Sequence, residues 1–175
     1  MPREVFLELS VGDRCLGCVY IRLWCHLRRA QQFLALCMGT LGPSLLKAKA
    51  SDKVRNMIVF RSAVDKNNQS VSHALLTGLE WGSKHSKSEA EGLVTGLTSY
   101  DNKVYDYNKR CNFYPNADLA FGICTQGQTD TVLNAVFGKV VEGLEVVKEA
   151  FQHNPVSEVT ITSCGMVMPG LLQES

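Results

Sequence analysis

Apolar and polar residues alternate at the start of the chain, which is the pattern of a half-buried β-strand. Residues 5–11 (Val-Phe-Leu-Glu-Leu-Ser-Val) follow this pattern and are rich in β-forming side chains. Gly12 and Asp13 then give a turn signal before a second β-rich run at 18–24. The two runs predict a β-hairpin.

The spacing changes to that of a helix directly after the hairpin. Apolar residues recur every three or four positions from 27 to 38, and Gly39 is a suitable stop residue. A second apolar stripe of this kind predicts a short helix near 143–151.

Short apolar runs bounded by turn residues predict further strands. They lie at 56–60, 93–97, 119–124, 136–140 and 158–163. No internal repeat is visible. A hairpin, a helix, scattered strands, a second helix and a closing strand predict a mainly β fold, a closed antiparallel barrel of about eight strands capped by two α-helices.

The composition limits the classes of partner. The chain has 175 residues, of which 45% are hydrophobic and 20% are charged, so we expect a single domain over 1–175. The net charge of +1 gives no general attraction to nucleic acid or membranes, and we expect neither as a partner. The sequence starts without the pattern of a secretory signal, and we expect an intracellular protein, cytoplasmic or nuclear.

The seven cysteines are an odd number and lie in apolar segments rather than at framework spacings. This usage favours a reducing compartment without disulfides. Cys15 and Cys18, followed by Cys25 and His26, offer an alternative interpretation as a zinc site or redox pair. No second Cys-x-x-Cys completes four ligands, and strand residues three apart point to opposite faces. We therefore expect no metal and no cofactor.

Two sets of motifs, one near each end of the chain, occur in the same order in a known family. The first reads Val-Phe-Leu-Glu-Leu at 5–9, Leu-Gly at 16–17 and Ala-x-x-Phe-x-Ala-Leu-Cys-x-Gly at 30–39. The second reads Phe-Gly-Ile-Cys-Thr at 121–125, Val-Phe-Gly-Lys-Val-Val-Glu-Gly-Leu-x-Val-Val at 136–147 and Ile-Thr-x-Cys-Gly at 161–165. Over residues 5–167 the chain thus resembles the cyclophilins, which implies an eight-stranded barrel and a peptidyl-prolyl cis/trans isomerase ancestry.

The resemblance also implies a mechanism. Rotation about an X-Pro bond has a barrier of about 20 kcal/mol, because amide resonance must be broken. The family lowers this barrier with an arginine that hydrogen-bonds near the prolyl nitrogen, while apolar groups hold the proline ring. The catalysis is electrostatic preorganisation and needs no nucleophile.

Two registers place the family's arginine in this sequence. The family pattern is Phe-His-Arg, followed eight residues later by the Gln of Gln-Gly-Gly-Asp. In the preferred register Arg61 is the arginine and Gln69 the peptide-gripping glutamine. In the alternative register Arg55 is the arginine and Phe60 the aromatic of the pocket, but Ala63 stands where the glutamine belongs. Both registers lack the histidine and the glycines.

Other positions of the implied peptide site depart from the family. Leu97 and Thr98 stand where the family has Ala-Asn, and they make a bulkier wall. Thr131 and Asn134 stand near the positions of a tryptophan and a histidine. Phe121 remains as an aromatic that we assign to the peptide site. The implied proline pocket is therefore degenerate.

One further stretch of the sequence is a candidate recognition surface. Residues 100–115 interleave aromatic side chains with both charges, in the place of a loop that rims the family's groove. The stretch is interpreted as a recognition surface or as a lid over its own aromatics; its acidic residues disfavour a single-strand nucleic-acid platform.

Three functions follow from the sequence. The first is a cyclophilin-like module that binds a protein or peptide segment, proline-containing segments included, within a larger intracellular protein. The second is a weak but genuine isomerase that depends on Arg61. The third is a domain that only packs within its parent chain. The substituted positions favour the first over an enzyme.

Overall fold

The fold is described from a computed structural model. The residues that it describes are 3–40, 44–54, 56–61, 83–85, 91–96, 120–126 and 133–168. None of the helices in these ranges is long and apolar enough to cross a membrane.

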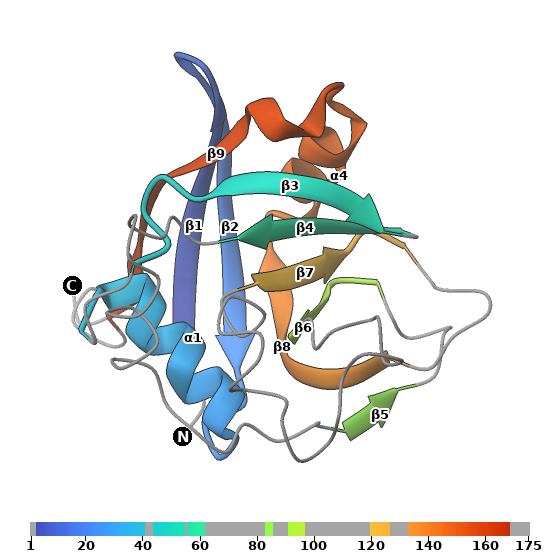
Figure 1. The fold of residues 1–175 in the computed structure, drawn as a ribbon. Helices are drawn as coiled ribbons and strands as arrows, with labels where there is room; N and C mark the ends of the chain where they lie inside the picture. Colours follow the sequence, from blue (N-terminus) through green and yellow to red (C-terminus); the bar gives the residue numbers. More distant parts are fainter. Residues whose placement is uncertain are drawn as a thin grey trace, which may run out of the picture.

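Nine strands and two α-helices make up the described part of the chain (Figure 1). The strands are β1 Arg3–Val11, β2 Arg14–Leu23, β3 Lys49–Val54, β4 Met57–Arg61, β5 Ser83–His85, β6 Leu93–Gly96, β7 Ala120–Cys124, β8 Leu133–Glu142 and β9 Val159–Met166. The helices are α1 Arg28–Met38 and α4 Leu144–Gln152, with a short 3₁₀ turn, η3 Val156–Glu158, before β9.

Eight of these strands close into an antiparallel barrel. Their order is β2-β1-β9-β3-β4-β7-β6-β8, and β8 pairs again with β2, which closes the ring. Among the described strands, β5 pairs with the beginning of β8, at Leu133 and Val136. Figure 1 places α1 and α4 at opposite ends of this barrel. The closed antiparallel barrel with two helices predicted from the sequence is confirmed.

The closure between β2 and β8 depends on one glycine. Leu23 pairs with Gly138 in this ladder. A Cβ atom at Gly138 would lie 2.8 Å from the backbone oxygen of Arg22 and 3.1 Å from the Leu23 side chain. The two strands approach closely at this position because residue 138 has no side chain.

The barrel interior is filled by aliphatic and aromatic side chains. Alternate residues of β1 and β2 point inward and are fully buried; these are Val5, Leu7, Leu9, Val19, Ile21 and Leu23. Phe33 of α1 closes one end, with its ring centroid 4.8 Å from that of Phe121 and 5.1 Å from that of Phe137. Burial of each large apolar side chain stabilises the fold by about 1.5–3 kcal/mol.

Helix α1 ends where the sequence predicts. Gly39 adopts the left-handed conformation with φ 70°, and its backbone N–H donates to the carbonyl oxygen of Ala35. Glycine is favoured at this position because it has no Cβ to strain the backbone.

The predicted strands and the structure differ in extent. The hairpin's second strand begins at Arg14 instead of residue 18, and β8 covers Leu133–Glu142 instead of 136–140. Strand β3 was not predicted, because its sequence Lys-Ala-Ser-Asp-Lys-Val is mostly polar and of its side chains Ala50 packs in the core. Main-chain pairing with β4 defines this strand more than its hydrophobic pattern does.

Candidate functional site

The sequence-predicted site residues divide into two groups. Phe60 and Arg61 lie on β4 and Phe121 on β7, in two strands that pair directly. Arg61 is the last residue of β4 and pairs with Ala120. The remaining predicted positions, together with the stretch 100–115, lie outside the described residues; these positions are Arg55, Gln69, Leu97 and Thr98.

Phe60 and Phe121 face the inside of the barrel. Phe60 is 0% exposed and Phe121 is 2% exposed, and both belong to the main apolar core. Their rings stack with centroids 5.3 Å apart and an interplanar angle of 15°. In this arrangement the two rings pack in the core, and their role in a peptide site stays a prediction.

The opposite face of the same strands carries a second apolar group. Because successive strand residues point to opposite faces, the neighbours of the core residues Ile58 and Phe60 face outward. They form what we call the outer cluster, which consists of Met57, Val59, Leu93, Cys124 and Val136, with Trp24 packed against it. Its five central members are 4% exposed or less, so this part of the barrel wall is closed to solvent.

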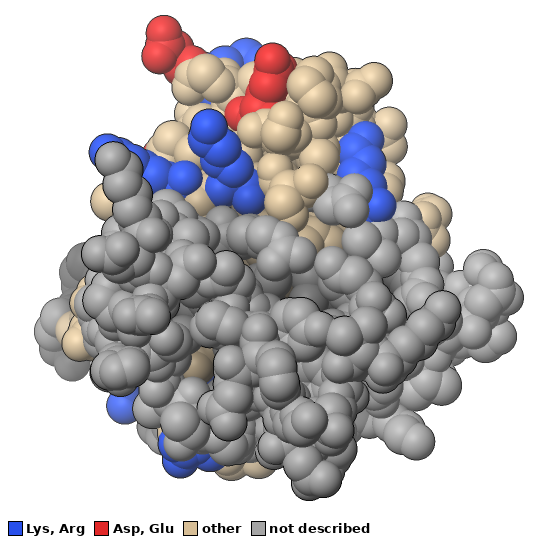
Figure 2. All heavy atoms as spheres, viewed as in Figure 1, with Lys and Arg blue, Asp and Glu red and all other residues tan. Residues whose placement is uncertain are grey.

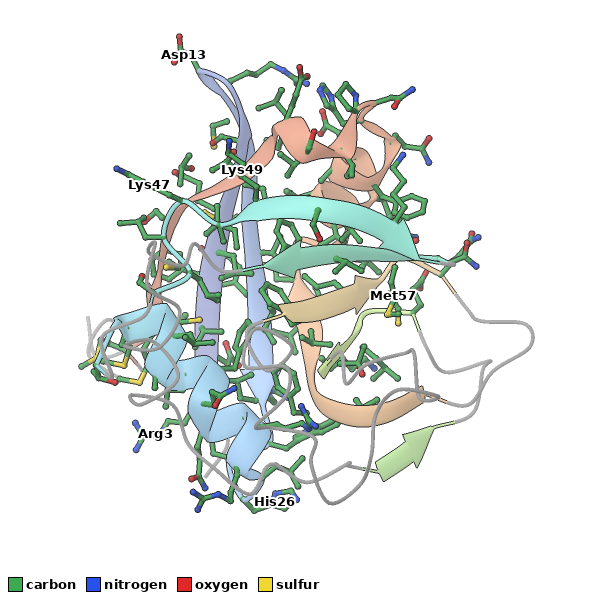
Figure 3. The ribbon with its side chains drawn as sticks, viewed as in Figure 1. Arg3, Asp13, His26, Lys47, Lys49 and Met57 are labelled. Carbon is green, nitrogen blue, oxygen red and sulfur yellow. The ribbon has the colours of Figure 1, made fainter. Side chains whose placement is uncertain are left out.

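A glycine interrupts the outer face at the centre of these strands. Gly122 of β7 pairs with Val59 on β4 and with Thr95 on β6. A Cβ atom at Gly122 would lie 2.9 Å from the Sδ atom of Met57. The Met57 thioether therefore lies over the position where a side chain of residue 122 would begin; Figure 3 shows Met57 at the β4 side of this wall.

Thr95 is a buried polar residue that sequence reasoning missed. It is 2% exposed, and its hydroxyl donates to the carbonyl oxygen of Gly96 over 3.1 Å. The sequence indicates only indirectly that Thr95 and Met57 lie on the outer face of the barrel. Both belong to short apolar runs that are buried on both faces, in which hydrophobicity alone does not separate the core face from the outer face.

The described titratable groups do not assemble a nucleophile site or a metal site of three or more ligands. Within the described ranges no three His, Cys, Asp or Glu side chains are grouped to hold a metal ion. The six cysteines in those ranges are free thiols. Burial raises the pKa of Cys37 well above its ordinary value, and burial also raises the pKa of Cys164, against a hydrogen bond with Ser44 that lowers it. Both shifts favour the protonated form of the thiol.

Charges of both signs are mixed on the described surface. Figure 2 shows Lys and Arg side chains separated from one another by uncharged residues, with Asp and Glu nearby. Arg14 pairs with Glu149 at 3.2 Å and Lys148 with Glu91 at 2.9 Å, both at exposed positions. Such a mixed surface does not favour a polyanionic ligand over the described residues.

Comparison with known proteins links this architecture to one fold. No family model and no curated protein sequence matches the chain. Among solved structures, the crystal structure of the Mimivirus cyclophilin aligns with a TM-score of 0.66 at 16% sequence identity, covering 95% of this chain and 89% of that one.

Proposed function

We propose, from the premise that this chain has the cyclophilin fold, that it is a protein-interaction module with little or no proline isomerase activity. We propose further that it acts within a larger intracellular protein and binds a protein or peptide segment through the barrel wall around β4, β7 and β6. Both proposals start from the cyclophilin fold of the chain. The local packing of the wall supports the loss of activity.

The packing of the outer cluster is the observation that carries this proposal. An isomerase of this fold needs an open apolar recess beside its arginine to hold the proline ring. Here Met57 and Val59, at the positions four and two residues before Arg61 on β4, are 4% and 2% exposed. The burial of these two side chains supports the proposal that the recess beside the candidate arginine is lost.

The position of Arg61 favours residual isomerase activity as the second candidate. Arg61 ends β4, next to the β7 strand that carries Ala120 and Gly122. An arginine at this place is what the preferred register requires for catalysis. A module that keeps the arginine but lacks the recess retains weak activity at most.

The experiment that tests the proposal combines activity with binding. Isomerisation of a short proline peptide and binding of a cyclosporin-type ligand are measured in parallel on the wild-type chain. We expect neither isomerisation nor binding of the cyclosporin-type ligand. In a separate pulldown with the same chain as bait, we expect a protein partner to be captured and identified. If weak activity is found, Arg61→Ala should abolish it under the preferred register, and Arg55→Ala should abolish it under the alternative.

A further inference from the structure

A β-bulge in the β1–β2 hairpin brings two cysteines to the same face of the barrel. The register shifts between Leu9 and Ser10, because β2 has one extra residue at this point. Cys15 is therefore opposite Ser10, and Cys18 is opposite Glu8. Ser10 and Glu8 are alternate residues of β1 and point to the same side, so the two cysteines opposite them share that side.

The shared side is the outer face of the hairpin. The Thr162 hydroxyl of β9 donates to the Glu8 carboxylate over 2.9 Å, and the Ser10 and Thr162 hydroxyl oxygens are 2.9 Å apart. On the neighbouring strand, Cys15 is exposed and Cys18 is partly buried, and both are free thiols. The pair is thus accessible from solvent on strands that do not carry the candidate peptide site.

This arrangement overturns the premise on which the sequence argues against a metal ion at Cys15 and Cys18. In a regular strand, residues three apart point to opposite faces, but the extra residue of the bulge returns the second thiol to the face of the first. The other ligands suggested by the sequence, Cys25 and His26, follow the far end of β2. Figure 3 shows His26 at the opposite end of the hairpin from Asp13, which comes just before the pair.

We propose that Cys15 and Cys18 form a two-thiolate site for a soft monovalent metal ion of the Cu(I) class. The two positions opposite them on β1 are about 6.8 Å apart along the strand. A disulfide requires Cβ atoms about 3.5–4.5 Å apart, so a direct bond between the sulfurs does not match this spacing. A metal ion between the sulfurs adds two bonds, each about 2.3 Å long in zinc thiolates, and spans it.

The number of ligands selects Cu(I) over Zn²⁺. A structural zinc ion takes four ligands. In the part of the chain that the structure describes, no group of three or more His, Cys, Asp and Glu residues could hold a metal ion. Cu(I) is a soft ion that prefers thiolates, and two of them in a linear arrangement complete its coordination.

The charges around the pair favour a bound cation. Burial raises the pKa of Cys18, and the negative charges of Glu8 and of a Cys15 thiolate raise it further. The neighbouring guanidinium of Arg14 is paired with Glu149 at 3.2 Å. A cation between the two sulfurs offsets the repulsion between their negative charges. Each thiol gives its proton to solvent on binding, and the copper ion keeps its oxidation state.

The test is a competition for Cu(I) between the reduced chain and the chromogenic chelator bicinchoninate, in the absence of oxygen. The wild-type chain should withdraw one more Cu(I) ion per chain from the chelator than Cys15→Ser or Cys18→Ser does. The other thiols are common to these chains, so the difference reports on the pair alone. X-ray absorption of the wild-type complex should show two-coordinate Cu(I) with sulfur ligands.

The matched control is Cys25→Ser, which removes a partly buried thiol beyond the far end of β2. It should withdraw as much Cu(I) as the wild type, and circular dichroism establishes that each variant is folded. Folded Cys15→Ser and Cys18→Ser chains that hold as much Cu(I) as the wild type overturn the inference. A wild-type chain that takes Zn²⁺ from a zinc chelator, and loses this ability in Cys18→Ser, overturns it as well. Neither result depends on isomerase activity or on a peptide partner.

Discussion

Two glycines with left-handed backbone conformations show how differently single residues constrain this fold. Gly12, in the β1–β2 turn, has φ 59° and open space where a Cβ would lie. Gly143, between β8 and α4, has φ 92°, and its Cβ would collide with the Cys18 carbonyl oxygen and lie 3.0 Å from the Val19 Cα. At Gly143 the obstacle is backbone, which cannot rotate away.

We predict that Gly143→Ala destabilises the chain much more than Gly12→Ala does. The turn substitution should cost about 1 kcal/mol of unfolding free energy, the strain of an alanine in this conformation. The substitution at 143 adds a collision between β2 and the start of α4, and we expect a loss of more than about 3 kcal/mol. Urea denaturation of the two variants measures the difference, and equal losses would show that β2 and residue 143 are not in close contact.

A pH dependence follows from the buried thiol of Cys37. Burial raises its pKa well above the ordinary value, so the folded state keeps the proton that the unfolded state releases first. Its contribution to stability is therefore complete below the ordinary thiol pKa of about 8.5 and is lost as pH rises toward the pKa of the folded state. Cys37→Ala should flatten the alkaline fall in unfolding free energy, and Cys15→Ala, at an exposed position, serves as its control. An unchanged slope in Cys37→Ala would contradict the burial of this thiol.

At the scale of elements, helix α1 and strand β6 approach each other closely where the Arg29 side chain lies over Gly96. Arg29, in the first turn of α1, is 6% exposed, and its Nη1 would lie 2.6 Å from a Cβ at Gly96. A cation in the first turn is opposed by the helix dipole, so this guanidinium is held by tertiary packing rather than by the helix.

We predict that Gly96→Ala and Arg29→Ala are coupled. Alone, Gly96→Ala should cost about 1–3 kcal/mol, because overpacking moves Arg29 from its place. In the Arg29→Ala background the same change should cost less, whereas Arg28→Ala, at the exposed neighbouring position, should leave the cost as it is. A double-mutant cycle by chemical denaturation measures the coupling, and additive effects would contradict it.

The elements that the sequence predicted are those with a complete local signal. The hairpin and α1 combine a clear hydrophobic period with a turn or stop at Gly12 and Gly39. Strand β3 has no such signal, since its place depends on β4 and on the single pair Lys49–Thr160 with β9. The assignment of Phe60 and Phe121 to a peptide site stays a prediction, and the sequence did not indicate that both rings lie in the core. Their residue type suits a pocket, but the strand register that turns them inward is a tertiary property.

At the scale of the whole molecule, the chain has the cyclophilin fold, and the outer cluster on the wall of β4, β6 and β7 is closed to solvent. The closed ladder and its apolar core account for the fold at 16% sequence identity to the Mimivirus cyclophilin. Such a core tolerates wide substitution if its pattern and volume are kept. Catalysis is less tolerant, because it depends on a few groups in fixed positions.

The measurement that tests the central claim most directly is the rate of cis/trans isomerisation of a short proline peptide by the wild-type chain, beside an active cyclophilin. We predict a catalytic efficiency at least about a hundredfold lower, which corresponds to roughly 3 kcal/mol less transition-state stabilisation. The loss of one preorganised donor commonly costs about this much. A rate enhancement near that of the active cyclophilin, abolished by Arg61→Ala, would contradict the account.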